Sequence, residues 1–305
     1  MSTLLTPRTC LGLFLGMTLF GSATPLSKLV AESFPTFSAS FLRVALGALV
    51  LSPLAWRDRS GLTPLTRTQV LRLIALALFG VVGFTALLLQ GMRLTSGVAG
   101  AVVMSTTPVV TALASVWFLN EAWTRAKVGS VGLAVAGVAL LHLSGPHPAG
   151  DASLGAVLLG SLFVFGAVCC EAAYSLLGKS VMDSISPALA VFVACVLSLP
   201  VFLGLALLFE REQLELHAIS VANGLTVAAW GAGTLGLGSV LWYSGLRQTE
   251  GSVAAGFMGV MPVSALVFSY LLLDEPVRWL HLAGFSLVLA GVIWMTREHR
   301  ENSGS

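Results

Sequence analysis

Two charged side chains lie deep inside long apolar stretches of the sequence. Glu171 lies within the apolar segment 154–178, and Arg43 lies about a third of the way into segment 36–56. Charges in such places are costly and mostly mark substrate or ion pathways. We expect Glu171 either to bind a proton or a substrate ammonium group in a cavity, or simply to be solvated in a wet vestibule. For Arg43 we favour pairing with a helix C-terminus or a loop carboxylate such as Glu32, with attraction of an anionic group as the alternative.

Polar and aromatic residues in the same stretches are candidates for the walls of a cavity. Methionine and aromatic side chains suit a forgiving pocket for varied amphipathic solutes. For any single one of these residues, ordinary helix packing is the favoured alternative. The candidates are Gln90, Ser105, Thr106, Thr107, Tyr174, Trp230, Trp242, Tyr243, Met258 and Met261.

Four prolines lie within apolar stretches: Pro25, Pro108, Pro200 and Pro262. Each removes a backbone donor and tends to kink a helix, which frees carbonyl groups toward a cavity. We therefore expect Pro25, Pro108 and Pro262 to act as kinks that take part in gating. A static kink that only aids packing is the alternative.

The composition requires a membrane to surround these elements. Of 305 residues, 56% are hydrophobic and only 10% are charged, which is too little charge to cover a soluble fold of this size. The apolar residues come in runs of about 20, the length of a helix that crosses a bilayer. We predict an all-α polytopic membrane protein with ten transmembrane helices. The spans lie near 9–31, 36–56, 69–90, 97–119, 125–143, 154–178, 186–209, 218–244, 252–273 and 278–296.

The basic residues predict the orientation of these spans. With a cytoplasmic N-terminus, eleven of the 16 lysines and arginines lie on the cytoplasmic side, as the positive-inside rule favours. Both termini are then cytoplasmic, and the expected location is the cell inner membrane, with multiple passes. Lys28 lies near the outer end of the first span and is expected to snorkel to the interface.

The two halves of the sequence resemble each other. Residues 91–141 align without a gap to residues 245–295, at an offset of 154. Shared proline, arginine and glutamate in one register are difficult to obtain by chance between two apolar segments. Because each half holds five spans, the second half must insert upside down, which is the inverted-repeat architecture of many secondary transporters. The informative matches are Arg93/Arg247, Pro108/Pro262 and Glu121/Glu275.

This repeated segment resembles the paired EamA domains of the drug/metabolite transporter superfamily. The resemblance rests on the proline within the span, the acidic residue that ends it, and the Ala-Gly pairs Ala136-Gly137 and Ala290-Gly291. The opening segment with Lys28, Pro35 and Arg43 is similar to the first two helices of that family, and "AAYSLLGK" resembles its sixth helix. The resemblance implies ten helices around a central cavity and export or exchange of small metabolites, with amino-acid exporters of the YddG kind among the similar members. Where the family commonly has tryptophan in helix six, this chain has Glu171.

These observations predict a secondary, non-ATP transporter that exports or exchanges small amphipathic metabolites, chiefly amino acids, by alternating access between two inverted repeats. A membrane enzyme acting on a lipid-like substrate and a facilitative channel are the alternatives. The five histidines are scattered and no paired carboxylates lie in the spans, which disfavours the enzyme. The four cysteines suggest neither a disulfide framework nor a metal site. We expect no cofactor.

The predicted domain organisation follows the repeat. Residues 1–143 form a first five-helix repeat, 144–153 a linker, 154–296 a second repeat and 297–305 a cytoplasmic tail. The expected partners are a small-molecule substrate and the lipid bilayer. A net charge of +2 without a dense basic run disfavours nucleic acid. A chain that carries both halves needs no second subunit to build a cavity, so we expect a monomer to suffice.

Overall fold

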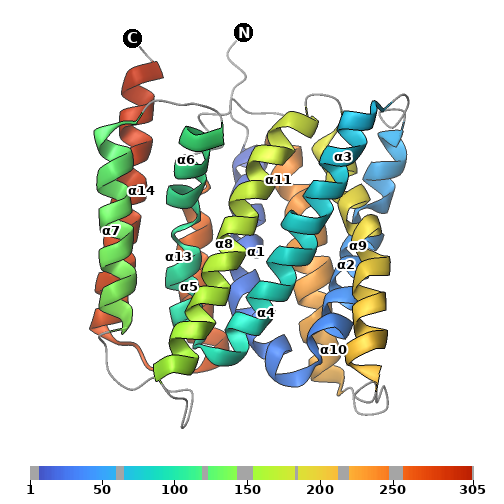
Figure 1. Cartoon of the computed structure of the whole chain (residues 1–305), viewed down its shortest axis with the longest axis horizontal. Helices are drawn as coiled ribbons and strands as arrows, with labels where there is room; N and C mark the ends of the chain where they lie inside the picture. Colours follow the sequence, from blue (N-terminus) through green and yellow to red (C-terminus); the bar gives the residue numbers. More distant parts are fainter. Residues whose placement is uncertain are drawn as a thin grey trace.

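The computed structural model describes residues 7–59, 65–118, 123–142, 154–182, 185–211, 220–246 and 257–303, and every regular element in these ranges is helical. The helices stand side by side, and α1 begins at the end of the bundle where α14 ends (Figure 1). Their bounds are α1 Pro7–Ser33, α2 Thr36–Arg57, α3 Arg67–Ala75, η2 Leu76–Gly83, α4 Phe84–Leu94, α5 Gly97–Met104, α6 Thr107–Phe118, α7 Arg125–His142, α8 Leu154–Met182, α9 Pro187–Phe209, α10 Val221–Ala228, η5 Ala229–Leu237, α11 Gly238–Leu246, α13 Val260–Leu273 and α14 Trp279–Ser303.

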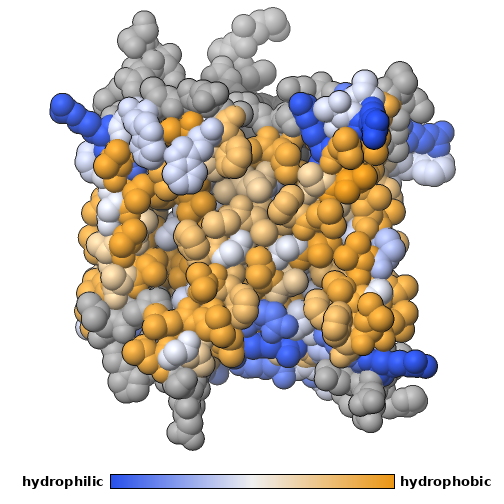
Figure 2. All heavy atoms as spheres, in the orientation of Figure 1, coloured by the Kyte–Doolittle hydropathy of each residue, from blue (hydrophilic) through white to orange (hydrophobic). Residues whose placement is uncertain are grey.

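The surface of the bundle fits a lipid environment. Within the described residues, seven helices are long and apolar enough to cross a membrane, and two shorter apolar helices lie toward the C-terminus. Figure 2 shows apolar side chains in a band across the middle of the bundle, with hydrophilic residues gathered at its two ends. Large apolar side chains such as Leu208 and Leu271 are about two thirds exposed or more, which water would disfavour. The chain is a polytopic membrane protein, and the count of ten spans stays a prediction.

The two halves of the chain pack against each other. The most extensive helix contacts join α7 with α14, α2 with α9, α1 with α13, and α4 with α8. Each of these pairs takes one helix from before residue 143 and one from after residue 153. The core therefore lies largely between the halves, and any site in it is built by both.

Glycines bring several of these helices into close contact. A Cβ at Gly16 in α1 would lie 2.9 Å from the backbone nitrogen of Trp242 in α11, and one at Gly231 would lie 2.8 Å from the carbonyl oxygen of Arg43 in α2. One at Gly236 would meet the side chain of Val50. Around Gly233, by contrast, the described residues leave 4 Å of open space. Small residues thus let the helix that contains η5 approach α2 on one face.

Two helices contain a π-helical segment at matching places in the two halves. The segment η2 covers Leu76–Gly83, and η5 covers Ala229–Leu237. The offset of 154 residues carries the first range to 230–237, so the two segments are nearly superimposed by the repeat. Segments of this kind are rare and occur frequently at functional sites.

Two of the prolines stand at helix starts rather than inside helices. The span that contains Pro108 is interrupted at Ser105 and Thr106, and α6 begins at Thr107. Likewise, a turn at Met258 and Gly259 precedes α13, in which Pro262 is the third residue. The structure thus interrupts both segments next to their prolines, and a proline is tolerated there because the backbone N–H in a first helical turn has no partner within the helix.

The other two prolines do lie within helices, Pro25 in α1 and Pro200 in α9. Pro25 is buried, and Pro200 lies on an exposed face. Only Pro25 is therefore both inside a helix and inside the bundle. The gating role expected of Pro25, Pro108 and Pro262 stays a prediction.

Candidate functional site

Arg43 lies in the core, where α2 meets α4 and η5. Its side chain is almost fully buried, with 6% of the residue exposed. One guanidinium nitrogen donates a hydrogen bond of 2.8 Å to the Thr85 hydroxyl. The guanidinium carbon lies 4.5 Å from the centre of the Trp230 ring and 5.6 Å from that of Phe84. These cation–π contacts hold the planar group between two aromatic rings.

Hydrogen bonding satisfies this cluster only in part. The Nε of Arg43 finds no acceptor among the described residues. The indole nitrogen of Trp230, which is fully buried, likewise has no acceptor within the described part of the chain. Buried donors without acceptors are uncommon because burial removes the water that would otherwise bind them. The cluster therefore presents two N–H groups that can still bind an acceptor.

Glu171 lies on α8 against the interruption between α5 and α6. Its carboxylate accepts a hydrogen bond of 3.1 Å from the hydroxyl of Thr107, the first residue of α6. Thr107 also donates to the Met104 carbonyl oxygen, at 2.7 Å. The interruption thus supplies the polar partner that an apolar helix would lack.

The charges of Arg43 and Glu171 attract one another across the core. The structure places no direct ion pair between them within its described residues. The expected partner of Arg43, Glu32, pairs instead with Lys28 at 3.0 Å, one turn away on α1. That expectation was wrong because Arg43 faces α4 and η5, whereas Glu32 lies at the end of α1.

Two tyrosines extend the cluster toward one end of the bundle. Tyr174 on α8 and Tyr243 on α11 both pack against the same core cluster and interact with each other. Tyr243 also lines a cavity of about 250 Å³. The cavity lies between the last turn of α2, the first turn of α9 and the end of α11. Its lining residues are Leu54, Arg57, Pro187, Ala188, Val240, Tyr243 and Ser244.

The other candidate wall residues are more dispersed. Ser105 and Thr106 donate to carbonyl oxygens of their own helix, at 2.6 and 2.7 Å, and lie beside the Glu171 contact. Gln90 donates to the Thr36 hydroxyl at 3.2 Å, near the end of α4. Trp242 packs its backbone against α1, and Met258 is 54% exposed in the turn before α13. The last three residues therefore lie outside the Arg43–Glu171 contacts.

Opposite the cavity, a carboxylate from the second half caps a helix of the first half. Glu210, which directly follows α9, accepts hydrogen bonds of 2.8 Å from the backbone nitrogens of Phe37 and Ser38 and from the Ser38 hydroxyl. These groups belong to the first turn of α2, where backbone N–H groups lack partners within the helix and attract anions. Glu210 therefore ties the end of α9 to the start of α2.

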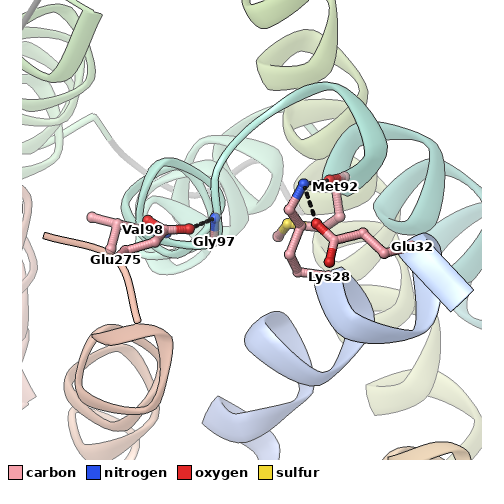
Figure 3. A network of polar contacts seen from close by, with 6 residues as sticks. All are labelled: Lys28, Glu32, Met92, Gly97, Val98 and Glu275. Carbon is pink, nitrogen blue, oxygen red and sulfur yellow. Dashed lines mark hydrogen bonds and ion pairs between the residues drawn. The ribbon is translucent and has the colours of Figure 1, made fainter. Parts of the chain in front are cut away.

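A second carboxylate does the same for α5, as Figure 3 shows. Glu275 accepts hydrogen bonds from the backbone nitrogens of Gly97 at 2.5 Å and Val98 at 3.0 Å. The preceding residue, Asp274, has a left-handed backbone with φ of 49°, which turns the chain after α13 toward α5. Burial raises the pKa of Glu275 above its ordinary value of 4.5, although the two N–H groups and Lys28 partly oppose this rise. We name the two caps made by Glu210 and Glu275 the carboxylate clasps.

Basic side chains at the same end join α1 to α4. Lys28 donates to the Met92 carbonyl oxygen at 2.9 Å while it pairs with Glu32 (Figure 3). Arg93 donates to the Phe34 carbonyl oxygen at 2.6 Å. The side chain of Lys28 therefore binds a helix end inside the protein.

Sequence inspection missed several of these residues. It did not single out Thr85 or Glu210, and it identified Glu275 only as the acidic residue that ends a repeated span, without a partner. The repeat gave a signal for Glu275, because its equivalent Glu121 also ends a span; Glu121 lies outside the described residues. Thr85 and Glu210 gave no comparable signal, since their roles depend on which helices meet.

Comparisons with known proteins agree with this architecture. A model of the EamA-like transporter family matches the chain twice, at residues 7–143 and 158–297. The uncharacterized transporter YetK of Bacillus subtilis (strain 168) is 30% identical over 284 residues, which cover 90% of this chain and 83% of YetK. YyaM, an uncharacterized transporter of the same organism, is 26% identical over 92% of this chain and 91% of its own length.

A third relative and a crystal structure extend the comparison. An uncharacterized transporter of Archaeoglobus fulgidus is 30% identical over 74% of this chain and 78% of its own length. One protein of known crystal structure matches 96% of this chain and 98% of its own, with a TM-score of 0.67 and 18% identity. At that identity, the match concerns the fold alone.

Proposed function

The chain belongs to the EamA-like transporter family, and we propose that it is a secondary transporter that moves small amphipathic metabolites, chiefly amino acids, without ATP. Membership makes it a membrane transporter rather than an enzyme. The substrate class, the direction of export or exchange and the alternating-access cycle are the proposed parts.

The proposed architecture is ten spans in two inverted five-helix repeats, with the division into residues 1–143, 144–153, 154–296 and 297–305 described above. Three observations support it. The family model matches the chain twice. The π-helical segments η2 and η5 occupy equivalent places, and so do the turns that precede α6 and α13. An inverted repeat of this kind suits a carrier, because the two halves can exchange conformations.

The observation that carries the proposed mechanism is the difference between the two ends of the bundle. Glu210 fastens the end of α9 to the start of α2, whereas the cavity lies between the start of α9 and the end of α2. Glu275 fastens the residue after α13 to the start of α5 (Figure 3). One conformation of an alternating-access carrier is closed at one end and open at the other. The hydrogen bonds of Glu210 and Glu275 would close one end, and the cavity lies toward the other.

The charges in the core support the proposed substrate class. Amino acids carry an ammonium and a carboxylate group. A buried arginine and a half-buried glutamate, with no direct ion pair between them among the described residues, provide the complementary charges. Nearby aromatic side chains would accept apolar parts of varied solutes.

By the positive-inside rule, the proposed location is the cell inner membrane with both termini in the cytoplasm. The clasped end would then face outward and the cavity inward. The bilayer and a small-molecule substrate are the proposed partners, and a monomer holds all of the residues named here.

The test is counterflow in proteoliposomes made with the purified chain. Liposomes loaded with an unlabelled L-amino acid should transiently accumulate the labelled form of the same amino acid. The panel should also contain cationic drugs and sugar phosphates. Flux without such trans-stimulation would favour a channel. Accumulation of drugs or sugar phosphates but of no amino acid would overturn the substrate class and keep the carrier.

A further inference from the structure

The two unpartnered N–H groups described above belong to one cluster. Arg43 uses one nitrogen on Thr85 and leaves its Nε without an acceptor within the described residues. The indole N–H of Trp230, whose ring lies beside the guanidinium, likewise has no acceptor within the described residues. Neither donor is exposed to bulk solvent, since the two residues are 6% and 0% exposed. A cationic donor beside a neutral donor is complementary to an anionic acceptor.

The cluster is also held rigidly. Phe84 and Trp230 flank the guanidinium. The absence of a side chain at Gly231, next to Trp230, lets η5 press against the backbone of Arg43. Trp230 itself lies in a π-helical segment. Preorganised donors lose little freedom when a ligand arrives, so a site of this kind binds more tightly than a flexible one.

A purely structural arginine would be expected to pair with the nearest carboxylate. Glu171 is the carboxylate whose charge acts on Arg43, yet it takes its hydrogen bond from Thr107, and the described contacts include no direct bond between the two. The guanidinium of Arg43 can therefore still bind an acceptor, while the carboxylate of Glu171 remains close enough for its charge to act on it.

We propose that Arg43 and Trp230 form the carboxylate-binding subsite of the transport pathway, with the guanidinium supplying the charge and the indole N–H a second donor. The subsite rests on the proposed transport of amino acids and goes further, because it assigns recognition of the carboxylate to two residues of α2 and η5. It predicts that solutes without a carboxylate bind far more weakly than matched solutes that have one.

The experiment compares ligands that differ only in this group. Purified protein is titrated with L-leucine, leucinamide and isocaproate, and binding is followed by thermal stabilisation and by competition against labelled leucine in counterflow. L-Leucine and isocaproate should bind, and leucinamide should bind at least about tenfold more weakly, the loss expected for one hydrogen bond to a charged group. Equal binding of leucine and leucinamide would overturn the proposal. A panel of other L-amino acids with their amides replaces this set if leucine is not carried.

Two variants assign the effect to residues. Trp230→Phe keeps a ring beneath the guanidinium but removes the N–H, and should weaken carboxylate binding several-fold without altering leucinamide binding. Arg43→Lys keeps the charge but removes the planar donor, and should weaken carboxylate binding about tenfold or more. Trp56→Phe, on an exposed residue outside the cluster, is the matched control. Unchanged carboxylate affinity in Trp230→Phe would overturn the role of the indole.

The outcomes separate this proposal from the proposed function. Counterflow of amines or sugars at a normal rate, with no preference for carboxylates, would overturn the subsite and leave the carrier. Absence of counterflow with every solute would overturn the carrier. Arg43→Lys protein that fails to fold would be recognised by its melting curve, and Trp230→Phe alone then decides the result.

Discussion

Glu210 and Ser38 are joined by two hydrogen bonds, since one carboxylate oxygen accepts both the backbone N–H and the hydroxyl of Ser38 at 2.8 Å. The contact reaches from the end of α9 to the first turn of α2. Glu275 makes the equivalent contact from the end of α13 to α5. Both carboxylate clasps therefore hold a helix of the first half through a residue of the second.

Removing a clasp should loosen that end of the bundle. Glu275→Ala leaves two partly buried N–H groups without an acceptor, which should lower the free energy of unfolding by about 1–3 kcal/mol. It should also increase labelling of a cysteine placed at the buried Thr95, measured with a membrane-impermeant maleimide in a background without the native cysteines. The control is Glu32→Ala, which removes an exposed carboxylate at the same end while Lys28 keeps its hydrogen bond to Met92, and should change both measurements little. Equal effects of the two substitutions would contradict the clasp.

Acidity should favour the clasped conformation. The pKa of Glu275 is raised above 4.5 by burial in the clasp, whereas an opened clasp would expose the carboxyl to water. The closed form therefore binds the proton more tightly, and its advantage grows as the pH falls through the raised pKa. Maleimide labelling of Thr95→Cys should decrease from neutral to mildly acidic pH. Glu275→Ala should abolish this dependence, and a dependence that persists in the variant would assign it to another group.

Alanine should have opposite consequences at two glycines of η5. At Gly231 the new methyl group would lie 2.8 Å from the Arg43 carbonyl oxygen, and backbone cannot move aside as a side chain can. We expect a loss of about 1–3 kcal/mol in stability and weaker transport. At Gly233 the methyl group would enter open space between described residues, so stability should hold or rise. Thermal unfolding and counterflow of both variants provide the measurement, and equal tolerance at Gly231 would be the contrary result.

Glu171→Gln should weaken binding of the substrate's ammonium group without affecting binding of its carboxylate. The amide keeps the size of the side chain and can still accept from Thr107, but it cannot attract an ammonium group. Leucine should lose affinity about tenfold, the effect of one charged hydrogen bond, whereas isocaproate should lose none. The pH dependence of transport should change as well. An unaltered rate and pH profile would leave Glu171 as a merely solvated residue, and Thr107→Val should give a smaller effect in the same direction.

The repeat-equivalent prolines allow a test of gating. Pro108→Ala and Pro262→Ala together should slow exchange if the turns before α6 and α13 have to flex, while each helix start should lose less than about 1 kcal/mol. Exchange rates in counterflow and melting temperatures are to be compared with those of Pro200→Ala, on an exposed face of α9. Normal exchange by the double variant would limit both prolines to a packing role.

Much of the architecture could be predicted from the sequence because a bilayer imposes simple rules. Span lengths follow from its thickness, and Glu171 and Arg43 were recognisable because charges are rare in apolar segments. The partners of these charges could not be predicted, since they depend on helix packing. For Arg43 the favoured partner was a helix C-terminus or a loop carboxylate such as Glu32. Glu32 instead pairs with Lys28, which lies four residues earlier on the same helix face.

The turn at Ser105 and Thr106 shows a second limit. A proline in an apolar stretch is compatible with a kink and with a fresh helix start, and both satisfy the same hydropathy. The backbone distinguishes them here: the helix is interrupted at Ser105 and Thr106, and α6 begins at Thr107, whose hydroxyl donates to Glu171 on α8. The wall roles of Met258 and Gln90 stay predictions for a related reason, since composition identifies suitable side chains without revealing which way they face.

The π-helical segments η2 and η5 also change which residues of their helices lie on the same face. Their hydrogen bonds reach five residues rather than four, so each segment holds a residue that a regular α-helix has no room for. Everything beyond is rotated by about 100°, the angular step of one residue. Thr85 is the second residue of α4, which follows η2, and it meets Arg43 with this rotation in place. Deleting one residue from Leu76–Gly83 would restore regular winding and swing Thr85 away from the guanidinium, although the composition of the helix would hardly change.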